Sequence, residues 1–102
     1  MLLKIFSVFD AKADAFLPPF FLHNNGLALR TFGDACNMKD HQFGKHPEDY
    51  TLFELGAFED ASGNFEIYKT PKSLGLGVEF VVHEVEGEIV PKTELKAIEG
   101  GK

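Results

Sequence analysis

The stretch 50-YTLFELGAFEDASGNFEIYK-69 decides the fold of this chain. Tyr50–Phe58 and Phe65–Lys69 are rich in the aromatic and aliphatic side chains that favour β-strands. The residues between them include Asp-Ala-Ser-Gly-Asn, a composition typical of a turn. The stretch therefore predicts a β-hairpin.

A further strand is predicted at the N-terminus, over Leu2–Phe9. Apolar side chains occupy both of its faces, with Leu3, Ile5 and Phe9 on one and Leu2, Phe6 and Val8 on the other. A strand of this kind is typical of the middle of a sheet that is covered on both sides. The next segment, Ala15–Leu22, contains Pro18 and Pro19, which forbid a helix interior or a central strand and predict an extended edge segment.

One amphipathic helix is predicted over Gly26–Met38. Asn24 or Asn25 is suited to the N-cap position, where a side-chain oxygen accepts a backbone N–H. At helical spacing one face of the segment is apolar; it consists of Ala28, Phe32, Ala35 and Cys36. This face is expected to pack on the sheet.

The remaining segments complete an α+β fold, a mostly antiparallel sheet with one main amphipathic helix packed on a face. The pattern predicts a polar loop at Lys39–Asp49, a linker at Thr70–Gly77, a strand at Val78–Val85 and a short helix at Pro91–Glu99. We expect a single domain over residues 1–99 and a frayed tail at 100–102.

Length and composition fit that expectation. The chain has 102 residues, of which 44% are apolar, including eleven Phe and no Trp. This is enough for one core and no more. Cys36 is the single cysteine, so no intramolecular disulfide can form. No segment approaches the roughly 18 apolar residues that a membrane helix needs, and we expect a cytoplasmic protein.

Charge limits the class of partner. The net charge is −6, and residues 51–102 hold ten acidic and five basic side chains. Proteins bind phosphate backbones mainly through Lys and Arg, so an acidic chain is a poor non-specific binder of nucleic acid. Any nucleic-acid role would need a local basic patch, base stacking or a protein intermediary.

No motif predicts an enzyme, a cofactor or a metal site. The densest set of ligand-type side chains comprises Cys36, Asp40, His41, His46, Glu48 and Asp49, and its spacing matches no zinc template. Cys36 is expected near the C-terminal end of a helix, where the dipole disfavours a thiolate. We interpret the set as a polar loop beside a buried thiol.

The aromatic residues exceed what one small core needs. Candidates for exposure are Phe20, Phe21, Phe43, Tyr50 and Tyr68, with Lys12, Arg30, Lys39 and Lys45 as basic neighbours. Exposed rings beside basic side chains could stack the bases of a single strand. The alternative is that most of these rings fill the core and the others form a subunit interface, and the negative net charge favours that alternative.

Several separated motifs resemble one family, the small non-structural protein of gokushovirus-type microviruses, which are bacteriophages with circular single-stranded DNA. The likeness covers residues 3–77, and its most distinctive part is His46-Pro-Glu-Asp-Tyr-Thr-Leu-Phe-Glu54. The other matching residues are Lys4–Asp10, Lys12-Ala13, Pro19–Phe21, Gly26, Ala28–Arg30, Phe32, Asp34, His41–Phe43, Lys45, Leu55-Gly56, Phe58–Gly63, Phe65-Glu66, Pro71 and Ser73–Gly75.

The resemblance implies a phage protein that is absent from the virion shell, acts inside the infected host cell, and binds DNA or helps viral synthesis switch from duplex to packaged single strands. It supplies no catalytic residues. We expect the contact surface in the segment from His41 to Leu52 and beside it, with candidate residues Lys12, Phe20, Phe21, Arg30, Lys39, Phe43, Lys45, His46 and Tyr50. The partner is expected to be single-stranded DNA or phage or host replication proteins; alternatively, the chain is a homo-oligomeric protein–protein interaction module.

Overall fold

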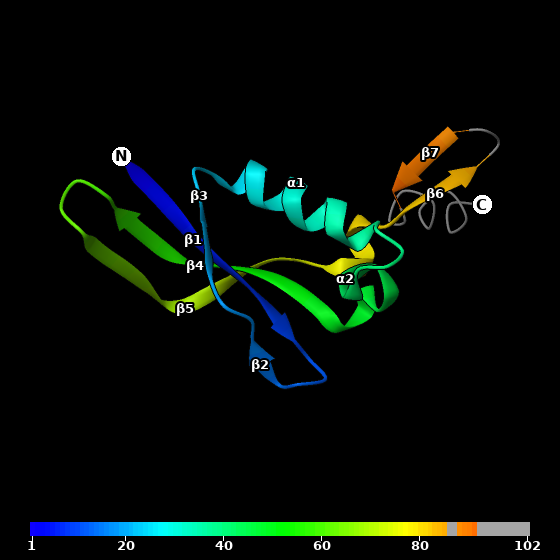
Figure 1. Cartoon of the computed structure of the whole chain (residues 1–102), viewed down its shortest axis with the longest axis horizontal. Coiled ribbons are helices and arrows are strands. Elements are labelled where there is room, and N and C mark those ends of the chain that lie inside the picture. The colour runs from blue at the N-terminus through cyan, green and yellow to red at the C-terminus, as the bar shows by residue number, and fades with distance from the viewer. Residues whose placement is uncertain (86–87, 92–102) are drawn as a thin grey trace.

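The computed structural model describes residues 1–85 and 88–91, and its centre is a five-stranded antiparallel sheet (Figure 1). The strands lie in the order β2-β1-β4-β5, and β3 also pairs with β1. Their bounds are Leu2–Asp10 for β1, Ala15–Phe16 for β2, Phe20–Leu22 for β3, Tyr50–Glu59 for β4 and Asn64–Leu76 for β5.

Four short or medium helices and a second hairpin complete the described chain. These are α1 (Asn25–Cys36), α2 (Gln42–Lys45), two 3-10 helices, η1 (Pro47–Asp49) and η2 (Gly77–Phe80), and the strands β6 (Val82–Val85) and β7 (Glu88–Pro91). β6 and β7 form a separate two-stranded sheet. No helix in the described part of the chain is both long and apolar enough to cross a lipid bilayer.

The predicted α+β fold is confirmed, together with its main elements. The hairpin, the N-terminal strand and the extended segment with two prolines all form, as β4–β5, β1 and β2–β3. Asn24 is the N-cap of α1, and its side chain accepts the N–H of Leu27 at 2.9 Å. Ala28, Phe32 and Cys36 are buried on the predicted helix face.

The core lies between α1 and one face of the sheet. β1 and β4 pair through Phe6 with Glu54 and Val8 with Leu52, so these side chains share that face. The buried members of this core are Phe6, Val8, Ala28, Phe32, Cys36, Phe43, Tyr50 and Leu52. No helix among the described elements contributes to the opposite face, where Phe9, Phe16 and Phe53 pack together instead.

Two predicted segments are wrong. Thr70–Gly77 is not a linker, because β5 continues to Leu76 and pairs with β4 through Ser73 and Phe53. The pairing leaves residues 68–71 of β5 without partners on β4, so the N–H that Pro71 lacks is not needed there. The strand predicted over Val78–Val85 begins only at Val82, after η2.

The predicted polar loop Lys39–Asp49 contains two short helices, α2 and η1. Phe43, buried in the core, fixes α2 against α1, and Pro47 begins η1. The predicted terminal helix Pro91–Glu99 lies outside the described residues except for Pro91, which ends β7. The predicted frayed tail 100–102 lies outside them as well.

Candidate functional site

Two of the predicted contact residues belong to the core. Phe43 and Tyr50 are buried, and their ring centroids lie 4.6 Å apart. Phe43 also packs on Phe32 of α1, with centroids 5.5 Å apart. A base cannot stack on rings that helix and sheet already enclose, so the expectation of exposed rings at these two positions is wrong.

Phe20 and Phe21 lie on opposite faces of the sheet because successive side chains of a strand alternate. Phe20 packs against Phe6 on the helix side, with ring centroids 5.8 Å apart. Phe21 pairs with Ile5 on the other face and keeps 41% of its surface exposed. Phe21 is therefore the predicted aromatic residue that remains available to a partner.

The predicted basic residues are exposed but come from separate parts of the fold. Lys12 lies in the β1–β2 turn, and Arg30 lies on the exposed side of α1. Lys39, Lys45 and His46 lie in or beside the segment that carries α2. Arg30 does not lie beside Phe21, because α1 covers the face opposite to that ring.

The open face of the sheet presents aromatic side chains that composition alone did not single out. One cluster joins Phe16 to Phe9 and Phe53, with ring centroids 5.0 and 5.3 Å away. The other joins Phe58 to Phe65 at 4.7 Å and to Phe21 at 5.8 Å. We call this surface the open aromatic face; it consists of Phe9, Phe16, Phe21, Phe53, Phe58, Phe65 and Ile67.

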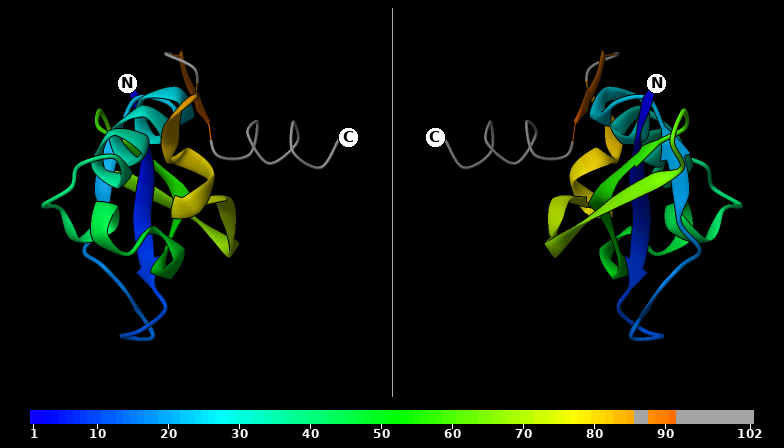
Figure 2. Two further views of the ribbon diagram at one scale, coloured as in Figure 1. Left: turned by 90° about the vertical axis from the view of Figure 1, so that its right-hand side faces the viewer. Right: turned by 90° about the vertical axis from the view of Figure 1, so that its left-hand side faces the viewer.

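Several members of the open aromatic face are accessible. The exposed fractions are 44% for Phe16, 60% for Phe65 and 62% for Ile67. Phe65 and Ile67 belong to the β4–β5 hairpin, whose tip extends past the start of α1 in Figure 1 and faces the viewer in the right-hand view of Figure 2. The sequence feature that could have identified these two residues is the alternation of side chains along β5. It places Phe65 and Ile67 on the same face as their partners on β4, Phe58 and Gly56.

On the helix side of the sheet, a buried carboxylate connects the start of α1 to the strands. Glu54 accepts hydrogen bonds from the Tyr68 hydroxyl, from Asn25 Nδ2 at 3.0 Å and from Lys4 Nζ at 3.2 Å. Burial raises the pKa of Glu54, but these three donors outweigh it and the net pKa is lowered. Glu54 is therefore ionised near neutral pH and is a poor candidate for a general acid.

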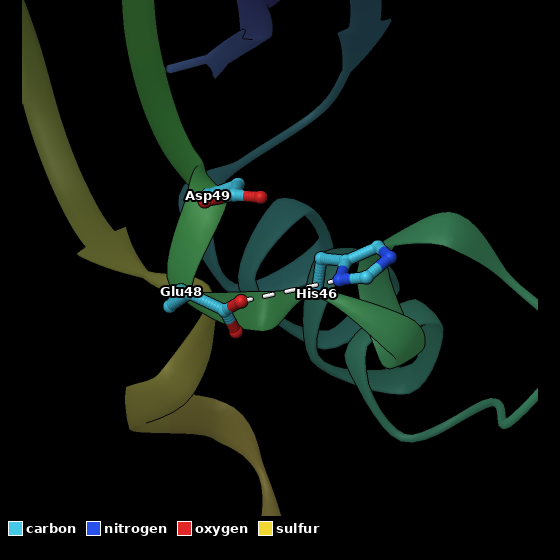
Figure 3. Close-up of side chains that lie close together, drawn as sticks. All are labelled: His46, Glu48 and Asp49. Carbon is cyan, nitrogen blue, oxygen red and sulfur yellow. Dashed lines mark ion pairs between the residues drawn. The ribbon is translucent and has the colours of Figure 1, made fainter. Parts of the chain in front are cut away.

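His46, Glu48 and Asp49 lie close together at η1, at the surface (Figure 3). His46 Nδ1 is 4.0 Å from Glu48 Oε2, and both side chains are about 60% exposed. Asp49 contributes a carboxylate from the next residue of the chain, and the ligand atoms lie within 4.8 Å of one another. This arrangement is that of a solvated ion pair that forms when the imidazole is protonated.

Two small cavities lie on the helix side. One, of about 180 Å³, is mainly apolar and is lined by Val8, Phe20, Thr31, Phe32, Ala35, His41 and Phe43. The other, of about 190 Å³, lies at the end of α1 beside Val81 and Val82. Sites for small molecules and cofactors usually measure about 300 Å³ or more. Both cavities are smaller than this, so the open aromatic face is the stronger candidate for a binding surface.

Comparison with known proteins identifies the family. The family model of the phage ORF5 protein matches residues 3–80, which include the five-stranded sheet except Leu2, together with α1, α2, η1 and η2. This chain belongs to the phage ORF5 protein family. It is therefore a bacteriophage protein, and the matched region of the ORF5-family chain ends just before β6. Searches of curated proteins and of solved structures found no match.

Proposed function

We propose that this ORF5-family chain is a non-enzymatic accessory protein that binds single-stranded DNA on its open aromatic face. It acts in the cytoplasm of the infected host, during viral DNA synthesis or packaging and beside phage or host replication proteins. The observation that carries the proposal is the exposure of Phe16, Phe21 and Phe65 on one face of the sheet.

The chemistry of these rings suits unpaired bases. Every base has a π-face, and stacking on an aromatic side chain contributes about 1–3 kcal/mol for each base without sequence preference. The bases of duplex DNA are already stacked on one another, so a surface of this kind favours single strands. Phe16 and Phe65 belong to two separate ring clusters, which offers more than one stacking position.

Charge restricts how such binding works. The chain carries a net charge of −6, so few phosphates are neutralised and stacking must supply most of the binding energy. Lys12 lies in the turn between Phe9 and Phe16 and is the basic residue nearest in sequence to one ring cluster. We expect it to contact the DNA backbone.

The test is titration of a fluorescent single-stranded oligonucleotide at low salt, with the chain and with Phe16→Ala, Phe21→Ala and Phe65→Ala. Each substitution should weaken binding on the order of 5- to 150-fold, the equivalent of one lost stack. Met38→Ala is the matched control, because Met38 is an exposed apolar residue outside the open aromatic face. No binding of the unmodified chain at low salt would reject the proposal.

A second candidate function is a protein–protein interaction module, and the combination of Ile67 with the negative charge favours it. Ile67 is 62% exposed and offers no ring for stacking. Exposed apolar surface on an acidic protein is also typical of a protein interface. A pull-down from infected host extract separates the two candidates. A protein that is still captured after nuclease treatment, but is not captured by Ile67→Ser, favours the interaction module.

A further inference from the structure

The two edges of the main sheet differ in their capacity to pair with another strand. At one edge, β2 has two residues and β3 has three, and Pro18 and Pro19, which lack an N–H, lie between them. At the other edge, β5 runs for thirteen residues, and β4 is its strand partner among the described elements. The β2–β3 edge is therefore blocked from pairing with another strand, whereas the β5 edge is available for it.

Only part of the β5 edge is suited to pairing. Lys69, Pro71 and Lys72 occupy its middle, and charged residues and proline are typical of edges that avoid pairing. Asn64–Ile67, next to the hairpin turn, holds one charge and two exposed apolar side chains. The pairing-competent segment is thus Asn64–Ile67.

We infer that a second copy of this chain pairs with Asn64–Ile67, antiparallel, to form a two-fold symmetric dimer through the β5 edges. A second copy fits because the segment is self-complementary. Residues opposite one another in an antiparallel pair lie on the same face, so Phe65 or Ile67, whichever lies on the two-fold axis, meets the same side chain of the other copy. The blocked opposite edge closes the assembly at two copies and prevents a fibre.

Charge also selects the register. A two-fold axis through Glu66 would place two carboxylates directly opposite one another, which is destabilising. An axis through Phe65 or through Ile67 avoids this contact and pairs two apolar side chains instead. The interface is small compared with the roughly 800 Å² per partner of stable complexes, so the dimer is expected to be weak and to depend on concentration.

The dimer would extend the open aromatic face. The axis of an antiparallel strand pair is perpendicular to the sheet, so both open aromatic faces lie on the same side of the joined sheet. This inference goes beyond the proposed function and is independent of it, because pairing uses the strand edge and DNA stacking uses the ring faces. If both hold, one oligonucleotide bridges two copies, and DNA strengthens the dimer.

Sedimentation equilibrium over a concentration series, combined with cysteine crosslinking, tests the inference. Phe65→Cys and Ile67→Cys each place a thiol beside a candidate axis, and Asp34→Cys on the exposed side of α1 is the control. Cys36 is 2% exposed, and burial raises its pKa to about 11, so the introduced thiol is the reactive one. We expect a reversible dimer and an intermolecular disulfide at Phe65→Cys or Ile67→Cys but not at Asp34→Cys.

A monomer at every soluble concentration would overturn the inference, and so would a dimer that forms no disulfide at either edge position. These outcomes are distinct from failure of the proposed function. A crosslinked dimer that binds no oligonucleotide would reject DNA binding and keep the dimer. A monomer that binds oligonucleotide would reject the dimer and keep DNA binding.

Discussion

Glu54 is the residue whose environment differs most from what its type suggests. It is 3% exposed within a strand of a small sheet, and its carboxylate is held by donors from β1, α1 and β5. Replacing the carboxylate by an amide removes the charge and one of its two acceptor oxygens, so Lys4, Tyr68 and Asn25 cannot all keep their hydrogen bonds. Because Lys4 is about one third exposed, solvent can replace part of that loss.

We predict that Glu54→Gln lowers the free energy of unfolding at pH 7 by about 1–3 kcal/mol. The folded pKa of Glu54 is lowered, so the unfolded state binds more protons. The stabilisation by Glu54 is complete above its unfolded pKa of 4.5 and is lost as pH falls through the lower folded pKa.

Urea unfolding between pH 7 and pH 3, followed for both proteins, checks this prediction. The difference between them should shrink as the solution becomes acidic. A difference that stays constant over this range would show that the carboxylate charge is not what stabilises the fold.

Residue patterns predicted the buried helix face but not which aromatic side chains are exposed. Ala28 and Phe32 follow from helical spacing alone. Phe43 and Phe16 could not be told apart by composition, because burial depends on whether α1 or solvent faces the ring. Phe43 packs on Phe32 of α1, whereas Phe16 packs on Phe9 and Phe53 of the open aromatic face.

At the scale of elements, one side chain connects α1 to the second hairpin. Asn37, the C-cap of α1, donates to the Phe80 carbonyl at 2.9 Å and accepts the Val82 N–H at 3.0 Å. β6 and β7 form a hairpin outside the main sheet, and isolated two-stranded hairpins are marginally stable in water. The start of β6 therefore depends on this contact.

We predict that Asn37→Ala increases hydrogen exchange at the Val82 amide and lowers the free energy of unfolding by about 0.5–2 kcal/mol. Asn37→Asp should protect the amide better than alanine does, since its carboxylate still accepts the bond from Val82. Equal exchange in all three proteins would mean that the Asn37 contact does not hold β6.

Two 3-10 helices that are far apart in sequence meet at a glycine. A Cβ built on Gly77 would lie 2.4 Å from the carbonyl oxygen of Pro47, so η2 could not approach η1 as it does. Gly33 in α1 is a matched control, because a Cβ there would make an ordinary contact 3.5 Å from the ring of Phe80.

We predict that Gly77→Ala destabilises the fold by about 1–3 kcal/mol, whereas Gly33→Ala is neutral or stabilises it by up to about 1 kcal/mol. Thermal unfolding of the two variants, compared with the unmodified chain, gives both values. An equal shift in the two variants would contradict the close contact between η1 and η2.

Local sequence pattern was sufficient to predict some helices and strands but not others. The β4–β5 hairpin and α1 follow from alternation, turn composition and capping. The continuation of β5 past Pro71 and Gly75 was not predictable, because these residues are typical of linkers. Only the irregular pairing with β4 gives Pro71 a position where no N–H is required.

At the scale of the whole molecule, one helix covers one face of the sheet and leaves the other to the phenylalanines. The sequence showed that both faces of β1 are apolar, but not which face α1 would cover. The acidic charge and the open aromatic face together define how DNA binding should respond to salt.

We predict a shallow salt dependence for oligonucleotide binding. With about one or two phosphates neutralised, the slope of log K against log salt concentration should be no steeper than about −1.5. Anisotropy titrations at several salt concentrations measure this slope. A slope several times steeper would indicate that Lys39, Lys45 or another basic residue, and not the open aromatic face, supplies most of the affinity.

The placement of the two tyrosines determines what the intrinsic fluorescence of this protein reports. Tyr50 is buried in the core and Tyr68 is hydrogen-bonded to Glu54, while the open aromatic face contains no tyrosine and the chain has no tryptophan. Emission from this protein thus follows the integrity of its interior and not the occupancy of its phenylalanine surface. Unchanged tyrosine emission therefore shows that a variant that no longer binds oligonucleotide is still folded.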